Sequence, residues 1–305
     1  MSYQLQEINR RIDQDVKGFL EACDAQYANK VSQAADTILN NLSTSPIVLL
    51  SGPSGSGKTT TALKIEEELE KRGVLSHTIS MDNYFKTLNP KTVPRTKDGS
   101  IDFESPLCMD MDLLNDHFAK LSKGETIIVP RFEFARQMRN DRLGEPLRLK
   151  KNEVAIFEGI HALNDVIIGK NPQAFKLYIA ARSNVVDEDG SVVFYHHWLR
   201  LCRRIVRDYK FRGSDAAFTL KMWANVRRGE QLYITPLKRR AHLCFDTSLI
   251  YELPVLRPLA EPLLATLPDE VPGVGSITGL LAQLRRVQPA EAGLVPQDSL
   301  LREFI

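Results

Sequence analysis

The stretch Gly52-Pro53-Ser54-Gly55-Ser56-Gly57-Lys58-Thr59 decides the fold. It fits the pattern G-x-x-x-x-G-K-[S/T], in which glycines let the backbone wrap closely around phosphate oxygens and point its N–H groups inward. The positive N-terminal end of a following helix strengthens such an anion site. A chance glycine-rich turn is the alternative, but an apolar run before the loop and a helical pattern after it favour a phosphate-binding loop.

Two side chains of this loop have expected roles toward a nucleoside triphosphate. Lys58 supplies a positive charge to the β- and γ-phosphates, and the Thr59 hydroxyl can ligate Mg²⁺. ATP and Mg²⁺ are therefore the cofactors that we expect. Binding a triphosphate does not by itself decide between hydrolysis and transfer to an acceptor.

The segments around the loop alternate between strand and helix patterns. Residues 47–50 form a short apolar run that predicts a buried strand, and residues 60–72 have a helical pattern that Gly73 ends. Further strands are predicted at 74–80, 126–129, 154–157 and 175–180, with a last core strand at 249–251. This order predicts an α/β protein with the P-loop NTPase fold, a mostly parallel sheet flanked by helices.

The rest of the chain divides into three segments. Residues 1–42 lack Pro and contain a single Gly, Gly18, and they predict a helical arm, which is either a dimerisation or regulatory element or a helix packed on the main domain. Residues 43–255 are the predicted P-loop domain, with a long loop at 86–107 and a polar insertion at 182–194. Residues 256–305 are a Pro-rich extension with a helix near 277–284 and a loose tail.

Composition excludes several classes of protein. The 305 residues carry a net charge of only +2, so no global charge calls for a nucleic-acid partner. The four cysteines are far apart and form no C-x-x-C pair, which speaks against a zinc site or a disulfide framework. The N-terminus has no apolar signal core and no run approaches membrane-spanning length. We expect a cytoplasmic protein without a membrane partner, for which a homo-oligomer stays open.

Two carboxylates follow predicted strands. Asp82 comes after the strand at 74–80, and Glu158 follows the strand at 154–157. In a parallel sheet the C-terminal ends of strands share one edge, where the phosphate loop also lies. Asp82 is the candidate base for the proton of an acceptor hydroxyl, and Glu158 the candidate for Mg²⁺ or the acceptor. The alternatives are a helix cap for Asp82 and a solvated loop acid for Glu158.

Four arginines recur at helical spacing. Arg200, Arg203, Arg204 and Arg207 fall on one face of the helix predicted at 199–209, and Arg212 follows it. Four like charges side by side are unfavourable unless anions lie against them, and guanidinium groups bind phosphates bidentately. We interpret this helix as a lid over the triphosphate. A solvated basic face or an RNA-binding stripe is the alternative.

The motifs together resemble the uridine kinase/phosphoribulokinase family of P-loop kinases between about residues 47 and 252. They are GPSGSGKTT at 52–60, SMDNYF at 80–85, DFESP at 102–106, PRFEF at 130–134, FEGIHAL at 157–163 and RLCRRIVRDYKFRG at 200–213. Residues 223–264 and the tail DSLLREFI look like a bacterial branch called nucleoside kinases. The resemblance implies Mg²⁺-dependent transfer of the γ-phosphoryl group of ATP to a sugar hydroxyl, commonly the 5′-hydroxyl of a nucleoside.

The resemblance also assigns site residues. The predicted catalytic residues are Asp82, Lys58, Arg203 and Arg207. The predicted nucleotide-binding residues are Gly52, Ser54, Gly55, Ser56, Gly57, Lys58, Thr59, Thr60, Arg207 and Arg212. The predicted substrate-binding residues are Asp82, Tyr84, Phe85, Ser105 and Phe132.

This sequence departs from the family pattern mainly on the acceptor side. Where pyrimidine nucleoside kinases have F-D-H-P and Y-D-F, Ser105 replaces the histidine and Phe132 replaces the tyrosine. Ser214 and Trp198 replace an arginine and an aspartate near the lid. A site that loses such hydrogen-bonding groups loses discrimination between bases. The leading hypothesis is a nucleoside kinase. The others are a kinase of another alcohol, such as a sugar phosphate or vitamin precursor, a nucleotide-binding regulatory protein and, ranked last, an RNA-binding protein.

Overall fold

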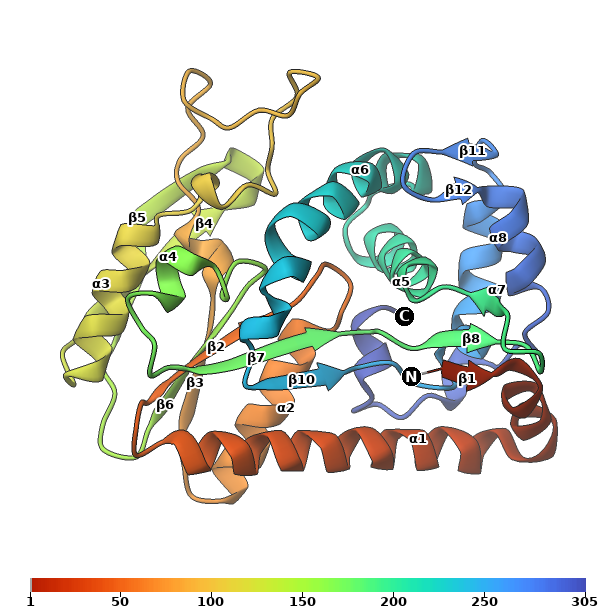
Figure 1. Cartoon of the computed structure of the whole chain (residues 1–305), viewed down its shortest axis with the longest axis horizontal. Helices are drawn as coiled ribbons and strands as arrows, with labels where there is room; N and C mark the ends of the chain where they lie inside the picture. The colour runs from red at the N-terminus through yellow and green to blue at the C-terminus, as the bar shows by residue number, and fades with distance from the viewer. Residues whose placement is uncertain (1) are drawn as a thin grey trace.

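The computed structural model describes residues 2–305, and within them a parallel sheet of five strands forms the centre (Figure 1). The strand order is β10–β7–β2–β6–β3, and every neighbouring pair is parallel. The bounds are β2 Ile47–Ser51, β3 Ser76–Ser80, β6 Val154–Glu158, β7 Phe175–Ala180 and β10 Leu243–Asp246. The predicted α/β fold class is confirmed.

Strand β2 shows why the sheet lies in the middle of the molecule. All five of its residues are buried, as expected for a parallel strand covered on both faces. Val48 and Leu50 belong to one hydrophobic cluster, whereas Ile47 and Leu49 belong to a second cluster on the other face. The two-residue period of a strand thus produces two cores.

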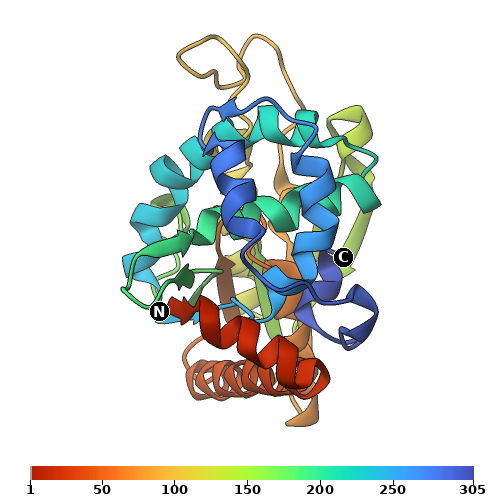
Figure 2. The same cartoon turned by 90° about the vertical axis from the view of Figure 1, so that its right-hand side faces the viewer.

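Helices cover the two faces. The first cluster joins β2 to the helices α1 Leu5–Asn41, α2 Lys58–Lys71, α5 His196–Phe211, α6 Ala216–Gly229, α7 Glu252–Leu264 and α8 Ile277–Leu284. The second cluster joins it to α3 Met111–Ser122 and α4 Asp165–Ile168. Figure 2 shows α1 beneath the molecule, with the contacting helices α7 and α8 side by side above it.

The N-terminal arm is helical, as predicted, with two details that the pattern does not reveal. Residue 1 of the predicted arm lies outside the described residues. Strand β1 (Ser2–Gln4) pairs with β8 (Asn184–Val186), and β8 pairs in turn with β9 (Val192–Phe194) inside the predicted polar insertion. Helix α1 is kinked at Asp15, whose φ of −159° and ψ of 83° are not helical. The arm packs on α2, the helix that follows the phosphate loop.

A separate hairpin stands beside the sheet. Its strands are β4 (Ile127–Glu133) and β5 (Met138–Leu147), which pair antiparallel. The long loop predicted at 86–107 is mostly irregular, with isolated bridges from Phe85 to Met109 and from Arg95 to Ile101. This loop projects from the molecule next to the hairpin (Figure 1).

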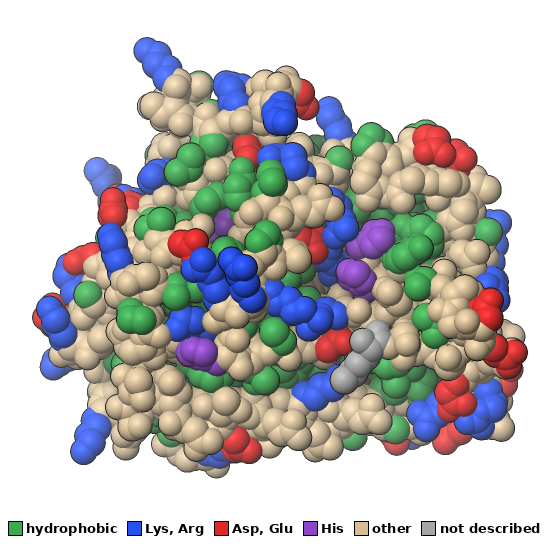
Figure 3. Space-filling view, viewed as in Figure 1, with side chains coloured by type: hydrophobic (Ala, Val, Ile, Leu, Met, Phe, Trp, Pro, Cys, Tyr) green, Lys and Arg blue, Asp and Glu red, His purple; other side chains and the backbone are tan. Residues whose placement is uncertain are grey.

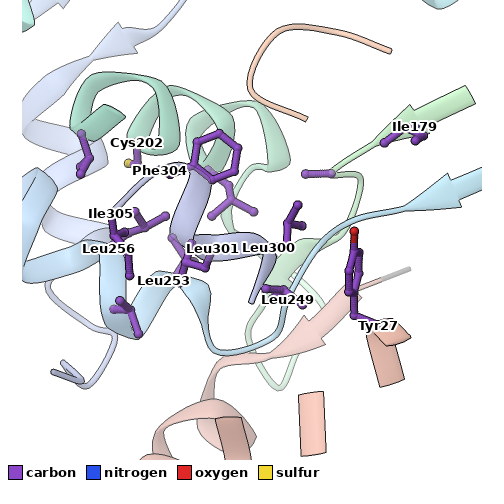
Figure 4. Close-up of a cluster of buried hydrophobic side chains, with 14 of the residues drawn as sticks. Tyr27, Ile179, Cys202, Leu249, Leu253, Leu256, Leu300, Leu301, Phe304 and Ile305 are labelled. Atoms are coloured by element: carbon purple, nitrogen blue, oxygen red, sulfur yellow. The ribbon is translucent and has the colours of Figure 1, made fainter. Parts of the chain in front are cut away.

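Two predictions about the C-terminal third are wrong. Residues 249–251 are not a strand, because β10 already ends the sheet and α7 begins at Glu252. The tail is not loose, because Leu300, Leu301 and Phe304 are completely buried. They lie beside Leu249, Leu253 and Leu256 in Figure 4. One cluster therefore includes residues from all three predicted segments, and the proposed domain boundaries stay a prediction.

The surface agrees with the modest net charge. In Figure 3 Lys and Arg side chains are spread over the face shown, with Asp and Glu between them. Across residues 2–305, no helix has both the length and the apolar character that crossing a membrane requires.

Short elements complete the chain: η1 Met81–Tyr84, η2 Pro106–Cys108, η3 Phe134–Arg136, η4 Glu230–Ile234, η5 Thr235–Arg240, β11 Glu270–Val271, β12 Gly275–Ser276, η6 Ala292–Leu294 and η7 Leu300–Glu303.

Candidate active site

The phosphate-binding loop joins β2 to α2, as its sequence predicts. Gly55 and Gly57 have φ values of +73° and +77°, a conformation that side chains other than glycine rarely adopt. A Cβ on Gly52 would lie 1.9 Å from the carbonyl oxygen of Ile179, so only glycine fits there. The backbone conformation therefore explains Gly55 and Gly57, and the close contact explains Gly52.

Side chains behind the loop bind its carbonyl groups. Arg203 donates from Nη1 to the oxygen of Gly55 at 3.2 Å, and Thr247 donates from Oγ1 to the oxygen of Ser56 at 2.7 Å. Arg200 reaches the oxygen of Ser54 at 3.5 Å. Because the carbonyls are bound from behind, the N–H groups of the loop are free to turn toward an anion in front.

A cavity of about 910 Å³ opens in front of the loop. Its lining includes residues of the loop together with Arg204, Arg207, Arg212 and Glu303, and several apolar and aromatic side chains, among them Phe85, Phe103, Phe132, Phe134, Phe218 and Met222. Arg204 contacts the loop and Arg207 contacts Glu303, and we call the loop and these charged residues the charged end of the cavity. Phe85, Phe132 and Phe134 pack against one another, and we call these three rings its aromatic end. The cavity thus offers charged groups for a phosphate donor and apolar groups for an acceptor.

The two predicted carboxylates line the same cavity. Ser80 and Glu158 pair across β3 and β6, so the chain after each strand enters the same edge of the sheet. Asp82 lies in the turn η1 and lines the cavity with Lys58 and Glu158. Sequence reasoning placed these groups at one edge, and the structure brings all three into one cavity.

Burial shifts the pKa values of these groups. Burial raises the pKa of Asp82, and the positive charge of Lys58 opposes that shift. Burial also raises the pKa of Glu158, and the positive charge of Lys58 again opposes the shift. For Lys58 burial lowers the pKa, while the charges of Glu158 and Asp82 work against it. The three groups are therefore electrostatically coupled, as expected where a proton is to be moved.

Oxygen ligands suited to Mg²⁺ lie beside the loop. Thr59 donates from Oγ1 to Oε1 of Glu158 at 3.4 Å. Mg²⁺ prefers one or two such oxygens together with the phosphates of its nucleotide. Within residues 2–305 no cluster of three His, Cys, Asp or Glu side chains could hold a metal without the nucleotide. The residues present therefore fit a metal that arrives with its triphosphate.

The arginines of α5 divide into two groups by depth. Arg200 pairs with Glu230 and Arg203 pairs with Glu252, each at 2.5 Å, and both guanidinium groups are buried. The prediction that the helix presents all four guanidinium groups to an anion is wrong for these two, because glutamates already partner them. The position of Arg203 behind the loop supports a structural role and does not support its predicted catalytic role.

The remaining arginines reach the cavity. Arg204 donates from Nη1 to Oγ of Ser54 at 2.9 Å, and Arg207 and Arg212 line the same end. Helix α5 itself packs against α6 and α7. Its predicted closing movement stays a prediction.

The predicted acceptor residues fall into two groups, those that line the cavity and those that do not. Phe85 and Phe132 line the cavity with their rings 5.7 Å apart, and Phe134 packs edge-on against both. Tyr84 is completely buried and bonds to Nδ1 of His117 at 2.9 Å. The Ser105 hydroxyl caps the turn η2 by accepting from the N–H of Leu107. The structure therefore keeps Tyr84 and Ser105 outside the cavity, contrary to the predicted substrate contacts.

Several residues that line the cavity were missed, among them Glu104, Gln137 and Glu303. Glu104 lies within the quoted DFESP motif, and burial raises the pKa of its carboxyl to about 7 against the nearby charges of Arg204 and Lys58. Gln137 has a φ of +49°, rare for a residue with a side chain and frequent at functional sites. Glu303 comes from the tail. Glu104 and Glu303 carried a signal in the sequence, because each lies inside a stretch that resembles the family, DFESP and DSLLREFI respectively.

Comparisons with known proteins agree with this geometry. Residues 47–250 match the model of the Phosphoribulokinase / Uridine kinase family. The chain is 30% identical over 200 residues to a uridine kinase of Anoxybacillus flavithermus, which covers 65% of this chain and 84% of that protein. It is 32% identical over 174 residues to a uridine kinase of Schizosaccharomyces pombe, covering 57% of this chain and 34% of that protein.

A solved structure shows the same fold. A putative fructose transport system kinase from Silicibacter sp. TM1040 superposes with a TM-score of 0.51 at 17% identity, covering 71% of this chain and 98% of that one. The family match spans the phosphate loop, both carboxylates and the arginines of α5. The chain thus belongs to the phosphoribulokinase/uridine kinase family and is a kinase, a phosphotransferase that acts on an alcohol group.

Proposed function

We propose that this kinase transfers the γ-phosphoryl group of ATP, with Mg²⁺, to the 5′-hydroxyl of a nucleoside. The observation that carries the proposal is that Lys58, Asp82 and Glu158 line one cavity together with the phosphate loop and with aromatic side chains. A reacting hydroxyl held in this cavity would have both a base and phosphate-binding groups close to it.

The charged end supplies the binding of the donor. Backbone N–H groups of the loop and the N-terminus of α2 receive the phosphates, and Lys58 spans the β- and γ-phosphates. Thr59 and Glu158 would hold Mg²⁺, which neutralises developing phosphate charge when bound. Arg204 and Arg207 add positive charge on the opposite side of the cavity.

Asp82 accepts the proton of the acceptor hydroxyl. Burial raises the pKa of this carboxyl, and a base whose pKa moves toward the working pH is a stronger proton acceptor. Lys58 opposes the shift and so keeps the ionised form accessible. The proton moves from the hydroxyl to an Asp82 carboxyl oxygen while the hydroxyl oxygen attacks the γ-phosphorus. The bond between that phosphorus and the β–γ bridging oxygen breaks, and ADP leaves with the electron pair.

The aromatic end favours a nucleoside among alcohols. Phe85, Phe132 and Phe134 offer ring faces and edges suited to a flat base. Glu104 and Gln137 also line the cavity and add hydrogen-bonding groups to it. A sugar phosphate would place its own negative charge among these rings, which is why we rank that acceptor second.

An acceptor screen tests the proposal. The purified protein with ATP and Mg²⁺ is incubated with pyrimidine and purine nucleosides, sugars, sugar phosphates and pantothenate-like alcohols, and ADP formation is measured. A nucleoside should stimulate ADP release well above the rate without acceptor. Stimulation by a sugar phosphate or another alcohol alone would contradict the nucleoside proposal, and tight ATP binding with no stimulation would favour a regulatory protein.

A further inference from the structure

The C-terminal turn η7 forms a wall of the donor end of the cavity. Leu300, Leu301 and Phe304 have no exposed surface and pack among the side chains of α7 in Figure 4. A Cβ on Gly57 would lie 2.6 Å from Cδ1 of Leu300, so this side chain lies directly on the phosphate loop. The turn lies beyond residues 47–250, which the family model matches.

This turn brings one carboxylate into the cavity. Glu303 accepts a hydrogen bond from Oγ1 of Thr60 at 2.6 Å and lies 3.4 Å from Nη1 of Arg207. The side chain is 19% exposed and lines the cavity with Lys58. Its charge also acts on Lys58, raising a pKa that burial lowers.

Both partners of Glu303 are groups that a donor would use. Thr60 lies in the first turn of α2, where the helix end favours an anion. The Nε of Arg207 is buried and makes no hydrogen bond within residues 2–305, although it lies 3.6 Å from Oδ1 of Asp208. It therefore keeps a donor that an anion at hydrogen-bonding distance can use. The ring of Phe304 lies 5.6 Å from the Arg207 guanidinium and supports it from behind.

We propose that Glu303 is an internal anion of the donor site: its carboxylate holds Thr60 and Arg207 in the empty site, and the phosphates of the donor take these partners from it on binding. The inference rests on the proposed use of ATP as donor. It requires only a rotation of the Glu303 side chain, because the buried residues around it keep the turn in place. Glu303 is thus a positioning residue whose negative charge competes with the donor.

The sign of the effect follows from charge. A glutamine at position 303 keeps an oxygen that can accept from Thr60 and Arg207, so it removes the charge and leaves an acceptor for these two donors. The carboxylate and a triphosphate are like charges beside the same cations, and their repulsion opposes binding. Removing the charge should therefore strengthen donor binding.

The test compares Glu303→Gln with wild type by calorimetric titration of ATP and, separately, of inorganic tripolyphosphate. We expect Glu303→Gln to bind both about tenfold more tightly, with the difference shrinking as salt is added. The acceptor KM should not change. Glu291→Gln serves as the matched control, since Glu291 is an exposed glutamate in the same tail.

Equal or weaker binding by Glu303→Gln, with an unchanged melting temperature, would overturn the inference. If the melting temperature of Glu303→Gln falls sharply, the same titrations are made with Glu303→Asp. This variant keeps the negative charge and should bind ATP like wild type. If wild type bound tripolyphosphate but not ATP, the proposed donor would fail while the inference would still be decided by the tripolyphosphate titration.

Discussion

Arg203 donates from Nε to the Glu252 carboxylate at 2.5 Å, and neither side chain has more than 1% of its surface exposed. The same guanidinium donates to the backbone oxygens of Gly55 and Thr247. An ion pair in the interior thus holds the phosphate-binding loop from behind. It ties α5 and α7 to the loop through one side chain.

Removing one partner of this pair should destabilise the fold strongly. In Arg203→Met, Glu252 becomes a buried charge without a partner, and the free energy of unfolding should fall by about 3–5 kcal/mol. Denaturant titration measures the loss. Arg203→Met combined with Glu252→Gln should lose less than Arg203→Met alone, whereas a single-variant loss below about 1 kcal/mol would mean that the pair is as weak as one on the surface.

Asp82→Asn should cut turnover and spare donor binding. The amide cannot accept the hydroxyl proton, and general-base catalysis contributes about 10²- to 10⁴-fold. We expect kcat to fall within that range, while calorimetry gives an ATP affinity within a few-fold of wild type. Asp112→Asn, at an aspartate that is 94% exposed, is the control and should leave kcat unchanged. Full turnover by Asp82→Asn would assign the proton to another group.

Gly57→Ala should disturb the loop more than its φ angle alone predicts. Gly190 has a similar φ of +83°, and a Cβ added there would meet nothing within 4 Å, whereas a Cβ on Gly57 would contact Leu300. Both alanine variants should lose about 1–2 kcal/mol from the left-handed conformation. Gly57→Ala should lose more and weaken ATP binding, and Leu300→Ala in the same chain should recover part of the excess. Equal losses at the two glycines would contradict the contact.

Glu104 should make stability depend on pH. Burial raises the pKa of its carboxyl from 4.5 to about 7, so the folded protein holds this proton more tightly than the unfolded chain. Stability linked to this group is therefore full below about pH 4.5 and is lost as the pH rises to about 7. The loss is at most about 3–4 kcal/mol at about 1.4 kcal/mol per pH unit. Glu104→Gln should remove it, and unfolding curves at pH 5 and pH 7.5 measure the difference from wild type.

Phe132→Ala should separate acceptor binding from donor binding. Loss of one stacking ring should raise the acceptor KM by about tenfold, because aromatic contacts contribute roughly 1 kcal/mol beyond the area they bury. The KM for ATP should stay within twofold, since Phe132 packs against the rings of Phe85 and Phe134. Parallel increases in both KM values would instead indicate a general loosening of the site.

The phosphate side of the site could be predicted from the sequence because its chemistry is local. The loop from Gly52 to Thr59 has a fixed length and fixed glycine positions, and strand order places Asp82 and Glu158 on its edge. The depth of Arg200 and Arg203 could not be predicted. Helical spacing puts four arginines on one face, but only the position of Glu230 and Glu252 in space decides which of them turn inward.

The tail could not be predicted for a related reason. The proline-rich segment before it and its short apolar pattern suggested a loose tail, whereas Leu300 and Phe304 pack against residues from distant parts of the sequence. Gln137 gave no signal at all, because its unusual φ arises from the turn between β4 and β5. Contacts between segments far apart in sequence leave no trace in local periodicity.

The contact between the tail and the loop also fixes the order in which the protein is completed during synthesis. Thr60 and Glu303 are 243 residues apart in the chain. A ribosome that adds about 5–20 residues per second makes the second of them roughly 12–50 s after the first. Throughout that interval the surface of Gly57 under Leu300 is open, and the guanidinium groups of Arg203 and Arg207 lack the ring of Phe304. A nascent chain can therefore form its sheet well before its donor site reaches the mature shape.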